Sequence, residues 1–306
     1  MQIFSDSIDS INTFTGNRTG LIIRNRPIPA DLLSLTDSLY GSKEIFQFDL
    51  YDNIDWNYLF IVKEADRSQF DLLVELSSQL PDKVVCIAEE GTGFHGFRNR
   101  GWDARKGNIH LSLFFKPQQN FPNFHAGVLI ASAVSIIETI DLIPGLENRA
   151  STKWVNDILI DGSKVSGVIT QTNSTGNILT GATIGIGLNV FATPAILSDK
   201  FTPKAECLHH FVNSQNYKID TILSNLLKSL AKNINKLNTK NYEKLYKKYC
   251  KRSSVIDKNV AVYSDKYNNT DQLTISGKVI RIGKNLELFF EGVKEPVRSG
   301  RLAMLE

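Results

Sequence analysis

The stretch KWVNDILIDGSKVSGVITQ, residues 153–171, places lysines, an Asn-Asp pair and two glycines in an apolar strand-turn-strand pattern. The pattern predicts one strand over residues 154–160 and a second over 165–169, because Asp161-Gly162 is typical of a two-residue hairpin turn. The hairpin is expected to bring together four polar side chains: Lys153, Asn156, Asp157 and Lys164. Such a cluster on a rigid base suits a carboxylate or phosphate ligand and its metal ion.

Composition is that of a globular protein with more than one domain: 306 residues, 42% hydrophobic and 22% charged. The sequence contains no uninterrupted apolar run of eighteen residues, and the N-terminus lacks the charged and apolar regions of a secretory signal. We therefore expect neither a membrane span nor secretion, and a cytoplasmic location. Three scattered cysteines argue against a disulfide framework and against a zinc site.

Charge is unevenly distributed along the chain. Residues 1–55 carry eight acidic residues against four basic ones, which argues against an N-terminal DNA-binding module. Residues 218–252 carry ten basic residues against two acidic ones, within two predicted amphipathic helices at 219–237 and 239–250. The simpler interpretation of these lysines is a solvated helix face; the alternative is a docking surface for an acidic partner.

The order of predicted elements indicates an α/β fold followed by a β domain. Residues 1–55 read as a small α/β extension with strands at 20–24 and 44–50 and a helix at 31–40. Residues 56–252 contain the predicted strands 56–62, 83–88, 108–115 and 178–190, a helix that Ser68 would cap through its hydroxyl, and a buried helix at 122–140. Residues 253–306 show short alternating segments typical of a small β-barrel.

The segment EEGTGFHGFRNRGWDARKG, residues 89–107, has no periodicity and is rich in glycine and arginine. Glycines let a backbone approach a ligand closely, and arginines attract phosphate. We interpret it as a flexible loop that grips an anion; the alternative is a solvent loop with scattered charge.

Four motifs in this order resemble those of the biotin-protein ligase family. KWVNDILIDGSKVSG resembles its KWPNDI strand and the turn that follows, and TIGIGLNV is similar to its GIGINV strand. GFHGFRNRGW lies where the family has GRGRRGRxW, and GNIHLSLFF matches GNLYLSL. The last residues resemble its C-terminal SH3-like domain. The resemblance covers residues 56–306 and implies a class II aminoacyl-tRNA-synthetase-like catalytic domain, with a mixed sheet flanked by helices, plus an SH3-like β-barrel.

The resemblance implies a two-step ligation. Biotin and ATP, with Mg²⁺, would form biotinyl-5'-AMP, and the biotin would then pass to a lysine in the biotin carboxyl carrier domain of a carboxylase. It assigns catalysis to Lys164 and the metal to Asp157. It assigns ATP and adenylate to His95, Arg98, Arg100, Trp102, Lys153, Asn156 and Asn189. It assigns biotin to Ser68, Gln69, Gly91, Gly96 and Gly167. DNA binding is not expected, and a homodimer is left open.

The chain departs from the family pattern in two places that contact ligand. Ser68-Gln69-Phe70 stands where the family has Ser-Thr-Asn, and His95-Gly96-Phe97 stands where it has Arg-Gly-Arg. Three interpretations follow: a divergent biotin ligase, a relative acting on lipoate, octanoate or another acyl acid, or a protein that binds ligand without efficient transfer. The missing RRxSGG-type loop argues against lipoate. Retention of Lys153, Asp157 and Lys164 argues against a mere binding module.

Overall fold

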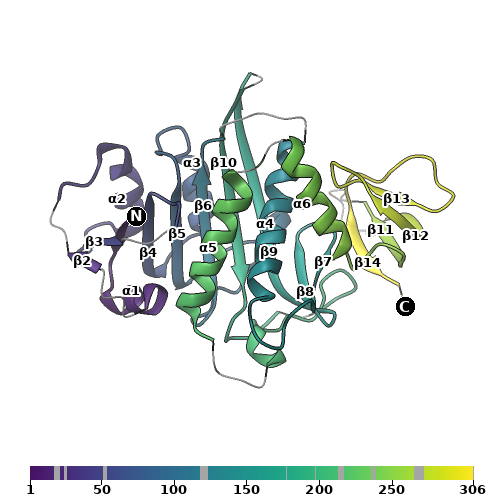
Figure 1. The fold of residues 1–306 in the computed structure, drawn as a ribbon, viewed down its shortest axis with the longest axis horizontal. Helices are drawn as coiled ribbons and strands as arrows, with labels where there is room; N and C mark the ends of the chain where they lie inside the picture. The colour runs from purple at the N-terminus through teal and green to yellow at the C-terminus, as the bar shows by residue number, and fades with distance from the viewer. Residues whose placement is uncertain are drawn as a thin grey trace.

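A computed structural model gives the architecture of the chain. It describes residues 1–16, 21–23, 26–50, 54–117, 123–176, 178–196, 198–212, 217–235, 237, 239–264 and 272–305. Within these residues the chain forms a ten-stranded sheet covered by helices and a separate four-stranded sheet at the C-terminus (Figure 1). The predicted α/β class, with a mixed sheet flanked by helices, is confirmed.

The large sheet has the strand order β2-β3-β1-β4-β5-β6-β10-β9-β8-β7. Its strands are β1 (Gln2–Ser5), β2 (Leu21–Ile23), β3 (Phe46–Leu50), β4 (Tyr58–Ala65), β5 (Val84–Gly91), β6 (Ile109–Phe115), β7 (Ala150–Lys153), β8 (Asp157–Ile160), β9 (Ser163–Thr175) and β10 (Ile178–Leu188). β1 and β5 both pair with β4 in parallel, and the remaining pairs are antiparallel. The sheet is therefore mixed.

Helices cover both faces of the sheet. The larger layer, in front in Figure 1, comprises α1 (Ile8–Thr15), α4 (Phe124–Ile140), α5 (Ile219–Asn235) and α6 (Thr239–Lys251). α2 (Leu33–Tyr40) and α3 (Gln69–Glu75) pack against the other face. Alternate residues of β4 enter the two cores: Leu59 and Ile61 the larger one, Phe60 and Val62 the smaller one.

Helix α4 is buried on almost every side, as its apolar composition predicts. Its three buried hydroxyl groups donate within the helix: those of Ser132, Ser135 and Thr139 each donate to the carbonyl oxygen four residues earlier, at 2.7–2.8 Å. Because these donors are satisfied locally, the helix can lie between the sheet and α5 and α6.

The N-terminal residues extend the large sheet. The predicted strands of this segment are present as β2 and β3, and the structure adds β1 and α1, which the sequence patterns did not indicate. β1 lies between β3 and β4, so the segment shares one continuous sheet with the following residues. Helix α1 begins after Ser7, whose hydroxyl accepts a hydrogen bond from the Ser10 amide.

The C-terminal residues form a second sheet of order β13-β12-β11-β14. Its strands are β11 (Asn259–Tyr263), β12 (Leu273–Ile282), β13 (Leu288–Phe290) and β14 (Arg301–Met304), paired antiparallel. Trp154 Nε1 donates to the Leu286 carbonyl at 2.6 Å and so ties this sheet to the turn after β7. A C-terminal β region is confirmed; its closure into a barrel stays a prediction.

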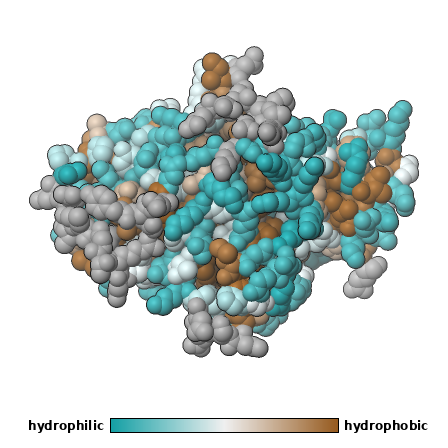
Figure 2. Space-filling view, in the orientation of Figure 1, coloured by the Kyte–Doolittle hydropathy of each residue, from teal (hydrophilic) through white to brown (hydrophobic). Residues whose placement is uncertain are grey.

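The surface in the region of α5 and α6 is largely hydrophilic (Figure 2). Lys232 Nζ and Lys248 Nζ reach Glu138 on α4, at 3.2 and 2.5 Å. They thus link the three helices. Among the described residues, no helix is long and apolar enough to cross a lipid bilayer.

Candidate active site

The hairpin predicted around Lys153–Gln171 is present with one boundary changed. The predicted strand over 154–160 is wrong at its start: β7 ends at Lys153, residues 154–156 form a turn, and β8 begins at Asp157. Lys153 pairs directly with Asp157, so only a tight turn fits between them. The turn at Asp161-Gly162 is confirmed, with both residues at positive φ, 49° and 82°.

Two rows of three residues, which together contain three glycines, form the floor of a pocket on the α3 face of the sheet. In the register of β6, β10 and β9, one row is Ser112–Gly185–Ile169 and the next is His110–Gly187–Gly167. Directly opposed residues point to the same face, so three glycines lie within one patch. Their missing side chains leave room above the sheet, and all six residues line the pocket.

Trp102 lies on this glycine floor. A Cβ on Gly187 would come within 2.1 Å of the Trp102 indole, so that position excludes any other residue while the ring stays in place. The indole Nε1 donates to His110 Nδ1 at 3.3 Å, and His110 Nε2 donates to the Arg105 carbonyl at 2.9 Å. Burial lowers the pKa of His110 to about 4, so the imidazole is neutral and can accept from Trp102.

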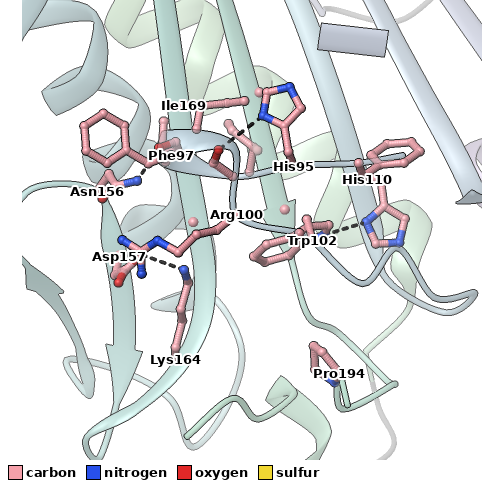
Figure 3. A pocket seen from close by; sticks show the side chains of 18 of the residues that line it. His95, Phe97, Arg100, Trp102, His110, Asn156, Asp157, Lys164, Ile169 and Pro194 are labelled. Carbon is pink, nitrogen blue, oxygen red and sulfur yellow. Dashed lines mark hydrogen bonds and ion pairs between the residues drawn. The ribbon is translucent and has the colours of Figure 1, made fainter. Parts of the chain in front are cut away.

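Lys164 enters the pocket from β9 (Figure 3). Its Nζ lies 2.7 Å from Asp157 Oδ1 and 5.6 Å from the Trp102 ring centroid. Gly167 makes room for it, because a Cβ there would lie 3.3 Å from Lys164 Nζ. Asn156, beside Asp157, donates from Nδ2 to the Val168 carbonyl at 2.7 Å. The site therefore offers one partly buried ammonium and one carboxylate at the edge of an apolar, glycine-floored cavity.

The loop after β5 folds back over this pocket as a narrow hairpin. Bridges join Gly91 to Ala104 and His95 to Gly101, and the Trp102 amide donates to the Phe94 carbonyl. His95, Gly96, Phe97 and Arg100 line the cavity from this side, so the predicted loop lies over the site. The side chain of Arg98 lies outside the described part of the chain.

Lys153 does not line the pocket that Lys164 enters. It is 4% exposed, and its Nζ donates to the Phe201 carbonyl at 2.5 Å. Burial lowers the pKa of Lys153, although Asp157 opposes the shift. Its side chain lines a neighbouring cavity, shared with Arg100 and Asp157 and closed by Arg298 and Arg301 of the C-terminal sheet region.

Two of the predicted biotin residues do not line the main pocket. Gly91 has a packing reason to be glycine, because a Cβ there would lie 2.5 Å from the Ala65 carbonyl oxygen. Gln69 is fully buried at the start of α3, and neither its amide nitrogen nor its amide oxygen has a hydrogen-bond partner in the part of the chain that the structure describes. Its neighbours on both sides, Ser68 and Phe70, do line the pocket.

The expected capping bond from Ser68 is absent. Ser68 occupies the N-cap position of α3, as predicted, but its hydroxyl makes no capping bond; the side chain is 3% exposed and lies in the pocket wall. Asn189 is similar. Its Nδ2 donates to the Glu206 carbonyl at 3.1 Å, while its Oδ1, buried in the pocket wall, has no partner among the described residues. Buried acceptors without partners are typical of ligand contacts.

Sequence reasoning missed several lining residues, among them His110, Ser112, Gly185 and Gly187. The one available signal was the period of two in Gly185-x-Gly187, which predicts two glycines on one face of a strand. On its own it did not indicate which face carried the pocket.

Residues 62–189 match the sequence model of the Biotin/lipoate A/B protein ligase family. This part of the chain is therefore similar to the domain that the family shares. It is 29% identical over 174 residues to the biotin--[acetyl-CoA-carboxylase] ligase of Mycobacterium tuberculosis, covering 56% of this chain and 59% of that protein. It is 30% identical over 134 residues to the bifunctional ligase/repressor BirA of Bacillus spizizenii, covering 44% of this chain and 39% of that protein. The chain thus matches well under two thirds of either relative.

The fold of the chain is also similar to that of solved ligase structures. The biotin protein ligase of Aquifex aeolicus in complex with biotin and ATP superposes with a TM-score of 0.61, covering 81% of this chain and 98% of that one, at 20% identity. At this identity the likeness establishes the fold. Most of the pocket lies in the matched stretch, since β5, β6, β9 and β10 all lie within residues 62–189.

Proposed function

We propose that this protein is an ATP-dependent biotin-protein ligase. It activates biotin as biotinyl-5'-AMP and transfers the biotin to a lysine of a carboxylase carrier domain. The observation that carries the proposal is Lys164, whose ammonium lies beside Asp157 at the edge of a glycine-floored pocket that Trp102 and the loop cover. The chain resembles proteins that are named as biotin ligases, and these names support the choice of reaction.

In the first step a carboxylate oxygen of biotin attacks the α-phosphorus of ATP, and the bond to the bridging oxygen breaks as pyrophosphate leaves. Two anions must approach each other, so a cation placed between them lowers the barrier. Lys164 would supply this cation. In the second step the carrier lysine amine attacks the acyl carbon, loses a proton and releases AMP.

The remaining pocket residues have roles that follow from their positions. Trp102 and the unpartnered Oδ1 of Asn189 would contact the adenine, whose exocyclic amine is a donor. Arg100 and, from the neighbouring cavity, Lys153 would contact the phosphates. Asp157 would hold Mg²⁺: the described residues contain no cluster of three His, Cys, Asp or Glu that could hold a metal, and a single carboxylate fits an ion bound mainly through ATP phosphates. The bound ion would offset phosphate charge.

Gln69 is buried behind the pocket wall, between the lining residues Ser68 and Phe70; we propose that its amide turns into the cavity when the acid binds, which would favour biotin over lipoate or octanoate. A buried amide without partners costs about 1–3 kcal/mol for each unsatisfied group. The ureido ring of biotin carries N–H donors and a carbonyl acceptor that can satisfy both ends of the amide. The dithiolane of lipoate and the alkyl chain of octanoate offer neither.

The test is pyrophosphate release with biotin, lipoate and octanoate offered separately. We expect release with biotin, and we expect Lys164→Ala to reduce it at least about a hundredfold, the loss usual for removing a charge-stabilising group. Lys232→Ala, on the far helix layer, is the matched control and should keep wild-type turnover. Release with lipoate or octanoate alone would overturn the choice of substrate. No release with any acid would favour a ligand-binding protein.

A further inference from the structure

One ion pair joins the loop over the pocket to helix α3. We call residues 92–103 the cover loop. His95 Nε2 lies 2.9 and 3.0 Å from the two carboxylate oxygens of Asp71, and His95 Nδ1 lies 3.2 Å from the Gly96 carbonyl oxygen. Both ring nitrogens therefore face acceptors. Only the doubly protonated imidazolium can donate to both.

The surroundings of the ring also favour its charged form. Burial lowers the pKa of His95, but the hydrogen bond to Asp71, the Gly96 carbonyl and the charge of Asp71 together raise it above its ordinary value. The edge of the Phe70 ring completes the contact, at 6.3 Å between centroids. Arg67, which precedes α3, and Glu75, its last residue, pair with each other at 2.5 Å.

The cover loop crosses the mouth of the pocket between two anchors. On the α3 side the anchor is the pair His95–Asp71. On the opposite side Arg100 Nη1 reaches the Thr202 hydroxyl at 3.5 Å, a long contact between exposed groups. The shorter, charged anchor is thus the one at α3. Since His95 and Phe70 both line the cavity, opening this anchor would uncover it.

We propose that His95 is a positioning residue whose ion pair with Asp71 latches the cover loop over the bound acyl-adenylate. The proposal rests on the function proposed above and adds a regulation of the same site. A histidine whose pKa is raised in the closed form stabilises that form fully below its open-form pKa, and the stabilisation is lost as pH rises through the raised value. Retention of the adenylate is therefore strongest in mildly acidic solution.

The experiment loads the enzyme with biotin and ATP, removes free nucleotide, and follows adenylate release from pH 6 to pH 9. We expect release from the wild type to be about two- to fivefold faster at the alkaline end, the range for a partly exposed pair. Asp71→Asn should release rapidly throughout. His95→Arg, which keeps a cation at every pH, should release slowly throughout. His125→Gln, an exposed histidine on α4, is the control and should follow the wild type.

A second measurement does not depend on catalysis. The imidazole NMR titration of His95 in the ligand-free protein should give a pKa above that of a free histidine, and Asp71→Asn should lower it. If the titration behaves so but no adenylate forms, the ligase function fails while the ion pair stands. If adenylate forms and wild type, Asp71→Asn and His95→Arg all release it at one pH-independent rate, the latch is overturned and the ligase function stands.

Discussion

The Trp102 indole rests on Gly187 so closely that a single methyl group at that position would overlap it, at 2.1 Å from Cζ2. The glycine is thus part of the binding surface, because it sets the height of the ring above the sheet. The neighbouring Gly167 likewise leaves space for Lys164. The stacking surface and the cation of the proposed adenylation site therefore both depend on absent side chains.

Gly187→Ala should displace Trp102 and weaken ATP binding. We expect about 1–3 kcal/mol loss of stability from overpacking and a KM for ATP raised several-fold. Thermal unfolding and steady-state kinetics measure the two effects.

Trp102→Phe in the Gly187→Ala background provides the control, because the smaller ring relieves the overlap. The double variant should be more stable than the sum of the single changes predicts. Strict additivity would mean that the ring does not rest on the glycine.

Gln69→Leu should change stability and substrate use in opposite directions. Replacing the unpartnered buried amide by an apolar side chain of similar size should raise the melting temperature of the ligand-free protein. The same change should raise the KM for biotin by about tenfold or more, because the ureido groups would lose the amide that we propose turns toward them on binding. A variant with an unchanged KM for biotin would show that the amide does not contact the acid.

Lys153→Met tests whether the buried lysine acts on phosphates. Because its side chain lines the neighbouring cavity, we expect a raised KM for ATP and unchanged affinity for biotin. Isothermal titration with each ligand separates the two. Equal affinity for ATP in wild type and variant would leave Lys153 the purely structural role of its bond to Phe201.

Glu138 should make the free energy of unfolding decrease as the pH falls. Burial opposes its ionisation, but hydrogen bonds from Lys248 and Ser229 and the charges of Lys248 and Lys232 lower its pKa to about 2. A carboxylate with a depressed folded-state pKa stabilises the fold above its unfolded value of 4.5, and the contribution disappears as pH falls towards 2. Glu138→Gln should cost roughly 2–3 kcal/mol at pH 7 and little near pH 2, as measured by urea unfolding.

Sequence patterns predicted the elements whose signals are local. The buried run of α4, the Asp161-Gly162 turn and the alternating strands were found because hydrophobic periodicity and turn chemistry act over a few residues. The patterns missed β1 and α1, and they joined residues 154–156 to a strand. In both cases the deciding interaction is a partner elsewhere, β3 and β4 for β1 and the register Lys153–Asp157 for the turn.

The sequence by itself predicted the family resemblance, the polar hairpin at residues 153–171 and the loop at residues 89–107, because motif order and spacing are written in the chain. Only the tertiary structure decided which residues meet. Strand register aligned Gly167 and Gly187 with His110 under Trp102, and packing brought His95 to Asp71, 24 residues away. Packing also directed Lys153 to a neighbouring cavity and left the Gln69 amide without a partner among the residues that the structure describes. These outcomes depend on pairing and burial between distant segments, for which the local pattern carries no signal.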